Sequence, residues 1–198
     1  MGLPTQLLLY GSAHAVSYLY FKHPTKSRDM IALLNTVALS MVSLYATYQS
    51  GLPQPALLLA APEQTLLNDS IAAHFITDLA IGHVLDNSNM ELVTGYIHHS
   101  AYAAILLSLR YTQQSNLIYL CLPFEIPTVL MNLNRMDPKK RLTIPFGATF
   151  LLFRVLYNLY VIAVLCTDPL KATVATMMLT VHAHWFRLWL SKFVNRNR

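Results

Sequence analysis

The chain has 198 residues, of which 55% are hydrophobic and only 12% are charged. An average soluble domain carries about 25% charged residues, so the composition argues against an ordinary soluble domain. The formal net charge of +5 does not indicate a nucleic-acid-binding protein, because the basic residues lie in short segments between apolar runs, as membrane topology signals do. Cys121 and Cys166 both fall within apolar runs, which argues against a disulfide framework.

Several apolar runs approach the roughly 20 residues that a helix needs to cross a bilayer. The sequence therefore predicts an all-α polytopic membrane protein, in which a bundle of about seven transmembrane helices surrounds a polar intramembrane cavity. Helices buried in a soluble core are the alternative for runs of this length. In chain order, the expected spans are Pro4–Phe21, Met30–Tyr48, Asp69–Leu85, Leu92–Leu109, Asn116–Asn134, Ile144–Cys166 and Ala172–Phe193.

One connection between the expected spans is long, and it covers Gln49–Asn68. It holds Pro53, Pro55 and Pro62 together with the apolar run Ala56–Ala61. Because proline interrupts helices, we expect this segment to be a loop that either lies on the membrane surface or dips into it.

The basic residues predict the orientation of the seven spans, because cytosolic loops of membrane proteins are enriched in Lys and Arg. A lumenal amino terminus and a cytosolic carboxyl terminus would leave Arg110 and Lys171 on the lumenal side and Arg154 within a span. All other basic residues would then be cytosolic, which favours this orientation. They are Lys22, Lys26, Arg28, Arg135, Lys139, Lys140, Arg141, Arg187, Lys192, Arg196 and Arg198.

Ionisable side chains in the third and fourth spans are the first candidate site residues. Each costs about 2.5 to 3.5 kcal/mol at the centre of a membrane helix, so such groups face the bundle interior and need partners. His74 and Asp78 share one helix face, where a carboxylate can hold an imidazole. His98 and His99 precede Tyr102 by about one turn. Adjacent residues differ by about 100° around a helix, so we expect one histidine to face the site.

Polar residues and prolines also mark the fifth span. Glu125, Thr128 and Asn132 are spaced to project from one helix face. Pro123 and Pro127 each remove a helix hydrogen bond, and broken helices at membrane depth line a cavity or are buried in protein. The sequence predicts either a cavity lining or a kinked helix with a satisfied polar seam.

The sixth span carries Arg154, with Asn158 one turn on. An arginine inside a membrane helix needs an anionic partner. Glu125 or Asp78 are candidates, as is a phosphate of a lipid or of coenzyme A. An internal ion pair that only fixes helix packing is the alternative.

Metal catalysis is a further alternative, because histidine and aspartate are metal ligands by type. Membrane desaturases and hydroxylases use clusters of roughly eight histidines, whereas the close histidine pairs here are His98–His99 and His182–His184. This ligand count favours a site without metal.

Six short segments, spread over most of the chain, form an ordered set of motifs. They are Asn35–Thr47, His74-Phe-Ile-Thr-Asp78-Leu, Tyr96-Ile-His98-His99, Phe124-Glu125-Ile-Pro-Thr128 with Asn132, Phe153-Arg154-Val, and His184-Trp185-Phe186. Together they resemble the TLC family, which contains ceramide synthases, translocating-chain-associated proteins and the ceroid-lipofuscinosis protein. The resemblance divides the chain into a first transmembrane helix with a basic loop (residues 1–29), a TLC-like six-helix membrane domain (30–193) and a short basic cytosolic tail (194–198).

The sequence differs from ceramide synthases in two respects. The stretch Tyr119–Phe124 lacks the aspartates that ceramide synthases carry after the paired histidines, and a homeobox-like segment is absent. The chain therefore looks more like the small TLC-domain proteins than like a true ceramide synthase.

The resemblance implies an endomembrane lipid-metabolism protein of the endoplasmic reticulum that transfers a fatty acyl group to a lipid or amine acceptor. No permanently bound cofactor is expected; acyl-CoA would be the cosubstrate, membrane lipids the partners and a homodimer a candidate assembly. His98 or His99 would act as base or acyl carrier, and Asp78, on one face with His74, would orient the imidazole.

The remaining polar residues would bind substrate. Thr128, Asn132 or Tyr102 would donate to the developing oxyanion, and Arg154 with the cluster Arg135–Arg141 would bind coenzyme A phosphates. A non-catalytic lipid-binding protein that regulates membrane composition, or a cargo escort, is the rival interpretation, because fold does not fix function. A transporter or channel is a third interpretation, but the sequence shows no inverted repeat to support it.

Overall fold

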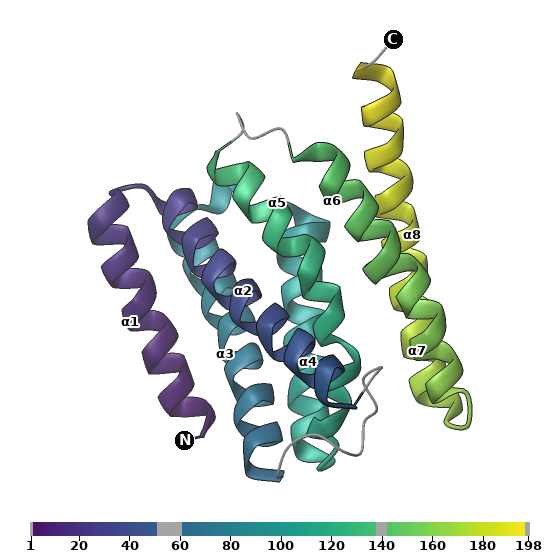
Figure 1. The fold of residues 1–198 in the computed structure, drawn as a ribbon. Helices are drawn as coiled ribbons and strands as arrows, with labels where there is room; N and C mark the ends of the chain where they lie inside the picture. Colours follow the sequence, from purple (N-terminus) through teal and green to yellow (C-terminus); the bar gives the residue numbers. More distant parts are fainter. Residues whose placement is uncertain (1, 51–60, 138–141, 197–198) are drawn as a thin grey trace. The chain divides into compact units, whose positions relative to one another are not determined.

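The structure is a computed structural model that describes residues 2–50, 61–137 and 142–196, and its regular elements in these ranges are helices (Figure 1). The α-helices are labelled α; η marks 3-10 and π-helical turns. The prediction of an all-α chain is confirmed. In chain order the elements are α1 (Leu3–Phe21), α2 (Pro24–Ser50), α3 (Ala61–Leu85), η1 (Asn87–Asn89), η2 (Leu92–Ile97), α4 (His98–Tyr111), η3 (Ser115–Leu120), η4 (Leu122–Glu125), α5 (Ile126–Met136), α6 (Thr143–Phe150), η6 (Leu151–Leu156), α7 (Tyr157–Leu165) and α8 (Pro169–Arg196).

Each of the seven segments predicted as a span is helical in the structure. The fifth is broken into two 3-10 turns and α5, as its two prolines predict. Two stretches, Pro24–Tyr48 and Thr143–Leu165, are long and apolar enough to cross a membrane, judged on length and composition.

The predicted loop Gln49–Asn68 is shorter than expected. Helix α2 continues to Ser50 and α3 begins at Ala61, so the loop prediction is wrong at both ends. Pro62 and Glu63 lie in the first turn of α3, where proline is tolerated and a carboxylate interacts favourably with the helix dipole. Pro53, Pro55 and most of the apolar run lie outside the described residues.

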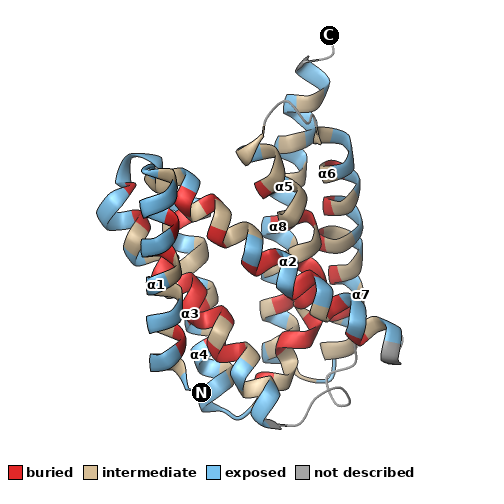
Figure 2. Cartoon of the chain, turned by 60° about the vertical axis from the view of Figure 1, so that its left-hand side comes forward, coloured by how far each residue is buried: buried red, intermediate tan, exposed pale blue. Residues whose placement is uncertain are grey.

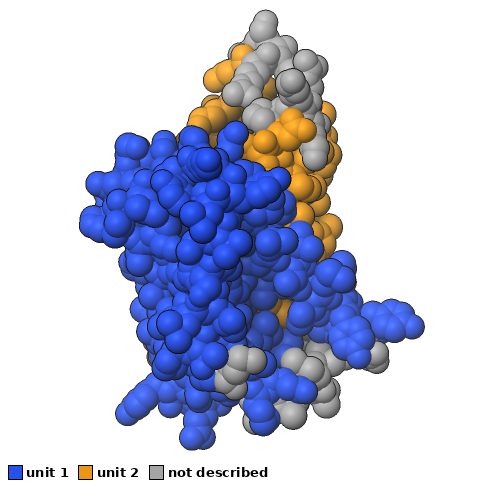
Figure 3. Space-filling view, turned by 90° about the vertical axis from the view of Figure 1, so that its left-hand side faces the viewer, with its two compact units in different colours: residues 1–121 blue, residues 122–198 orange. Residues whose placement is uncertain are grey.

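The chain divides into two compact units, coloured separately in Figure 3: unit 1 spans Met1–Cys121 and unit 2 spans Leu122–Arg198. Within unit 1, α3 packs against α1, α2, α4 and η3. Within unit 2, α8 packs along α6, η6 and α7. A Cβ on Gly147 of α6 would collide with the Trp189 ring of α8, so glycine is required for these two helices to approach.

Helix α1 turns its polar side chains inward and its apolar side chains outward. Gln6, His14 and Ser17 are buried, whereas Leu8 and Leu19 are each 73% exposed. The buried residues in Figure 2 follow the inner side of this helix. Water-soluble proteins bury apolar helix faces, so α1 shows the inverse of the soluble pattern.

Helix α2 repeats the pattern of α1. Ser40 and Ser43 are buried while their neighbours Met41, Leu44 and Tyr45 are exposed. Polar groups inside and apolar groups outside are the arrangement expected where the surrounding solvent is hydrocarbon.

Candidate functional site

Asp78 of α3 lies at the centre of a buried polar cluster in unit 1. Its carboxylate accepts two hydrogen bonds from Arg28 of α2: Nε to Oδ1 at 3.0 Å and Nη2 to Oδ2 at 2.8 Å. The Asp78 and Arg28 side chains are only 5% and 12% exposed. A bidentate pair of this kind fixes the plane of the carboxylate.

His99 is the histidine of the predicted pair that reaches Asp78. Its Nδ1 lies 3.1 Å from Oδ2 of Asp78. The π-helical turn η2 ends immediately before the pair, and π-turns inside helices frequently accompany functional sites. The structure therefore brings together two of the predicted catalytic residues, Asp78 and His99.

His98 faces an aromatic neighbourhood. Its ring centroid lies 4.4 Å from that of Tyr102 and 5.8 Å from that of Phe75. The Phe75 ring also contacts His99, with ring centroids 5.2 Å apart, and the ion-pair contact with Asp78 that the structure shows is made by His99.

His74 is buried beside the cluster, within electrostatic range of Asp78 on the same helix. Its ring packs against Tyr10 and Phe75, with centroids 5.5 and 5.7 Å away, and its Nδ1 has no hydrogen-bond partner in the described part of the chain. The oxygens of Asp78 are already engaged by Arg28 and His99. The expected His74–Asp78 hydrogen bond is therefore not among the contacts of Asp78.

His14 of α1 joins this cluster, and sequence reasoning missed it. Its side chain is 2% exposed, and neither ring nitrogen has a hydrogen-bond partner among the residues described. It lies within electrostatic range of Asp78 and Arg28. The available signal was the spacing of Gln6, His14 and Ser17, which places these polar residues on one helix face.

Two backbone contacts hold α1 against α2 at the level of His14. The Ser27 hydroxyl donates to the His14 carbonyl at 3.2 Å, and the Ser17 hydroxyl donates to the Ser27 carbonyl at 3.4 Å. The position of the His14 ring therefore depends on the start of α2, the same segment that carries Arg28.

Arg28 also connects the cluster to the end of α3, which corrects its expected place among the free cytosolic charges. Its Nη1 donates to Oδ2 of Asp86 at 3.0 Å. Thr25 and Asn89 donate to Oδ1 of the same carboxylate at 2.9 and 2.7 Å. Burial by itself would raise the pKa of Asp86, but the hydrogen bonds from Asn89, Thr25 and Arg28 outweigh it and hold this pKa below its ordinary value.

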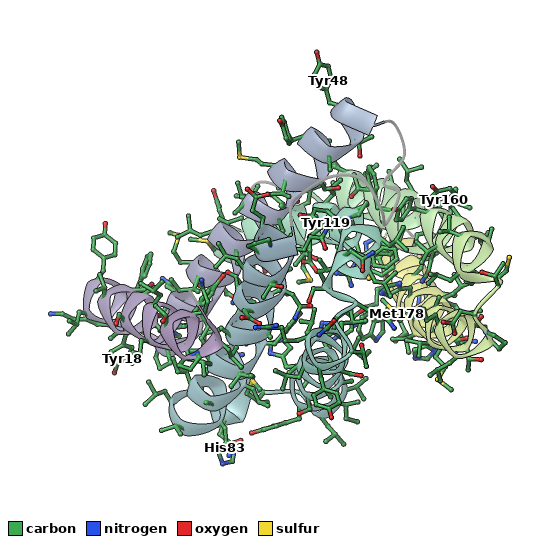
Figure 4. The ribbon with its side chains drawn as sticks, turned by 90° about the horizontal axis from the view of Figure 1, so that it is seen from below. Tyr18, Tyr48, His83, Tyr119, Tyr160 and Met178 are labelled. Atoms are coloured by element: carbon green, nitrogen blue, oxygen red, sulfur yellow. The ribbon has the colours of Figure 1, made fainter. Side chains whose placement is uncertain are left out.

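His83, near the end of α3, lies outside the cluster. It is exposed, and in Figure 4 its side chain points away from the helices. Its Nδ1 lies 2.9 Å from the hydroxyl of Tyr96, which donates to Asn87 at 2.6 Å. These contacts tie the η1–η2 connection to α3.

Unit 2 has a separate polar cluster around Arg154, which lies in the π-helical turn η6. Its Nε donates to the Phe124 carbonyl at 2.9 Å and its Nη2 to the Thr128 hydroxyl at 2.7 Å. The guanidinium carbon lies 5.5 Å from the centroid of the Phe150 ring. The structure thus joins Arg154 to Thr128, whereas Asp78, a candidate partner, is engaged by Arg28.

The backbone of Arg154 takes part in the same cluster. A π-turn leaves a carbonyl without its usual helical donor, and the Arg154 carbonyl lies 3.0 Å from Nδ1 of His182. Asn158 Nδ2 is 3.4 Å from the same nitrogen. Asn158 and His182 are almost fully buried, so their contacts lie inside the packing of η6 and α7 against α8.

The remaining predicted residues of unit 2 lie on or beside α5. Asn132 is 1% exposed and its amide nitrogen has no hydrogen-bond partner in the described ranges. Glu125 is the residue that immediately precedes α5 and is partly exposed. Of the basic cluster Arg135–Arg141, residues 138–141 lie outside the described residues.

The predicted site residues are thus divided between the two units. The four predicted catalytic residues, His74, Asp78, His98 and His99, belong to unit 1 together with Tyr102, one of the six predicted substrate-binding residues. The single intramembrane cavity that all ten would share stays a prediction. The other five predicted substrate-binding residues belong to unit 2 and are Glu125, Thr128, Asn132, Arg154 and Asn158.

A search of the described residues finds no group of three or more His, Cys, Asp or Glu side chains arranged to hold a metal ion. Comparison of the chain with protein-family models, with curated proteins and with solved structures finds no match. The TLC resemblance and the activity that it implies therefore stay predictions.

Proposed function

We propose that the chain is an integral membrane protein of the endoplasmic reticulum in which all seven helical segments span the bilayer. Large apolar side chains are exposed on every α-helix, while polar side chains such as Asn68, Asp69 and Asn158 are at most 1% exposed. Polar side chains buried to this extent, combined with large apolar side chains exposed on every α-helix, are the reverse of the pattern of soluble helices. If hydrocarbon surrounds the helices, both the exposed apolar side chains and the buried polar side chains are explained.

We further propose that unit 1 carries an acyl-transfer site of the kind the TLC resemblance implies. One observation carries this proposal: Nδ1 of His99 lies 3.1 Å from Oδ2 of Asp78. At this distance the contact is electrostatic, because Nδ1 of His99 makes no hydrogen bond among the described residues. A rotation of the ring that turns Nδ1–H onto Oδ2 would leave the lone pair on Nε2 to accept a proton. An imidazole oriented by a carboxylate in this way is the usual arrangement of a general base.

In this mechanism His99 removes the proton of the acceptor while the acceptor attacks the acyl-CoA carbonyl. The carbon–sulfur bond then breaks, and the proton passes from His99 to the leaving thiolate. Asp78 stabilises the imidazolium that exists between these steps, and Arg28 holds Asp78 in place. Tyr102, which belongs to the same unit as His99 and Asp78, is the candidate donor to the oxyanion.

The test is an acyl-transfer assay on the purified protein with radiolabelled acyl-CoA and a panel of amine, alcohol and lysolipid acceptors. Loss of a general base costs about 10²–10⁴-fold in rate, so His99→Ala should lower kcat/KM by at least about 100-fold. His184→Ala, at an exposed histidine of α8, is the matched control and should be unchanged. Equal activity of His99→Ala and the wild type would eliminate the base assignment.

A non-catalytic lipid-binding protein is the second candidate, and one observation favours it. Arg28 bridges Asp78 and Asp86, and closed ion-pair networks commonly serve to fix helix packing. The decisive measurement is mass spectrometry of lipids extracted from the purified protein. A stoichiometric lipid together with no acylated product in the assay above would favour this candidate.

A further inference from the structure

Three imidazoles from three helices gather near Asp78: His14 of α1, His74 of α3 and His99 of α4. His14 and His74 are 2% and 5% exposed, and the two lie within electrostatic range of each other. Both nitrogens of His14 and Nδ1 of His74 have no hydrogen-bond partner in the described part of unit 1. The large majority of buried side-chain polar atoms in proteins are paired, so these nitrogens mark a place for a hydrogen-bonding group that the chain itself does not supply.

The charges around this place restrict the group. The carboxylate of Asp78 is paired with Arg28, so it offers little net attraction to a cation. Arg28 in turn donates to two carboxylates, Asp78 and Asp86, so its positive charge is already compensated. The ion pair that the imidazoles face, Asp78 with Arg28, is neutral as a pair.

An uncharged hydroxyl fits these surroundings better than an amine. An alkyl amine has a pKa of about 10 and is an ammonium ion at neutral pH. Burying that cation is costly where the nearest carboxylate, Asp78, is already paired with Arg28. A hydroxyl is neutral and both donates and accepts hydrogen bonds. A neutral imidazole has one donor and one acceptor nitrogen, so the two kinds of group are complementary.

We propose that His14 and His74 bind the hydroxyl group of a lipid alcohol, and that this alcohol is the acyl acceptor of the site. The inference rests on the proposed acyl transfer and names its acceptor class. His14 is a positioning residue: it holds the hydroxyl while His99 removes its proton. The alcohol oxygen then forms the ester bond to the acyl carbon, the carbon–sulfur bond of the thioester breaks, and the thiolate takes the proton from His99.

The experiment compares two acceptors that differ only in the reacting group, 1-hexadecanol and 1-hexadecylamine, with palmitoyl-CoA as the donor. Ester formation should exceed amide formation by at least 20-fold in kcat/KM. His14→Leu, which removes both ring nitrogens, should raise KM for hexadecanol at least 10-fold while kcat stays within threefold. His14→Asn keeps a hydrogen-bonding group and should recover most of the loss, whereas His184→Leu, at an exposed histidine, should match the wild type.

A binding measurement keeps this inference distinct from the proposed activity and does not depend on turnover. Hexadecanol should raise the Tm of the detergent-solubilised wild type and His14→Asn, but not that of His14→Leu.

Faster amide than ester formation, abolished in His99→Ala, would overturn the hydroxyl acceptor and leave acyl transfer standing. Equal stabilisation of wild type and His14→Leu by hexadecanol would overturn the binding site. No product from either acceptor, with His14-dependent stabilisation retained, would overturn acyl transfer and leave the alcohol site.

Discussion

The guanidinium of Arg28 crosses α3 directly over Gly82, where the hydrogen atom of the glycine is the largest group that fits. A Cβ at residue 82 would lie 2.8 Å from Cζ of Arg28 and 2.6 Å from Sδ of Met90. Gly82 is one turn beyond Asp78 on the same helix face. The bidentate pair between Arg28 and Asp78 therefore requires glycine at this position.

Gly82→Ala should displace Arg28 and destabilise the protein. The methionine side chain can move, but the guanidinium is held by two carboxylates, and overpacking of this kind costs roughly 1–3 kcal/mol. The measurement is thermal unfolding of the detergent-solubilised protein. Gly11→Ala is the matched control, because a Cβ at Gly11 meets nothing within 4 Å, and alanine in a helix interior is favoured over glycine by about 1 kcal/mol. Equal behaviour of the two variants would contradict the role of Gly82.

Arg28→Gln should destabilise the protein more than Asp78→Asn does. The arginine change leaves two carboxylates, Asp78 and Asp86, without their cation, whereas the aspartate change leaves Arg28 paired with Asp86. Breaking one side of a buried ion pair costs roughly 3–5 kcal/mol, which is the expectation for Arg28→Gln. Denaturant unfolding in detergent provides the comparison, with Arg187→Gln at an exposed arginine of α8 as the control.

The double variant tests whether the two residues act as a pair. Residues in one ion-pair network show interaction free energies of roughly 0.5–3 kcal/mol, so Arg28→Gln with Asp78→Asn should lose less stability than the sum of the two single losses. Strict additivity would show that the contact contributes nothing of its own.

The helix positions could be predicted from the sequence because long apolar runs are a local signal. The exact residues at which the helices begin and end could not be predicted, as Arg28 illustrates. In the sequence it precedes the apolar run and resembles a loop charge, but Pro24 begins α2 one turn earlier. Which carboxylates Arg28 then meets depends on Gly82 and on the connection after α3, and no local pattern encodes that distance.

The candidate site shows the same division between local and tertiary information. Spacing alone predicted that His74 and Asp78 share one helix face, but it could not predict that both oxygens of Asp78 would contact groups from other helices. Spacing could also have identified His14, whose polar neighbours Gln6 and Ser17 share its helix face. His14 is not among the predicted site residues because residues 1–29 lie outside the TLC-like domain, in which the candidate residues were sought.

Acid should weaken the protein through Asp86. Its pKa in the folded state is below its ordinary value, which is about 3.9 for an unfolded chain. The folded state therefore binds fewer protons, so this group stabilises the fold fully above about pH 4 and its contribution is lost as the pH falls through the lower, native pKa. Asp86→Asn should flatten the dependence of Tm on pH below about pH 4 relative to the wild type. Thr25→Val, which removes one donor to Asp86, should change the curve in the same direction by a smaller amount.

The seven-span arrangement can be tested with the native cysteines. Cys166, between α7 and α8, is exposed, and seven spans with a lumenal amino terminus place it in the lumen. A membrane-impermeant maleimide added to sealed microsomes should label it only after permeabilisation. Asn195→Cys, at an exposed residue near the end of α8, should be labelled in intact microsomes, because the last span ends in the cytosol. Labelling of Cys166 in sealed microsomes would place it in the cytosol. That result would require an odd number of spans before it or a cytosolic amino terminus, and it would contradict the seven-span orientation.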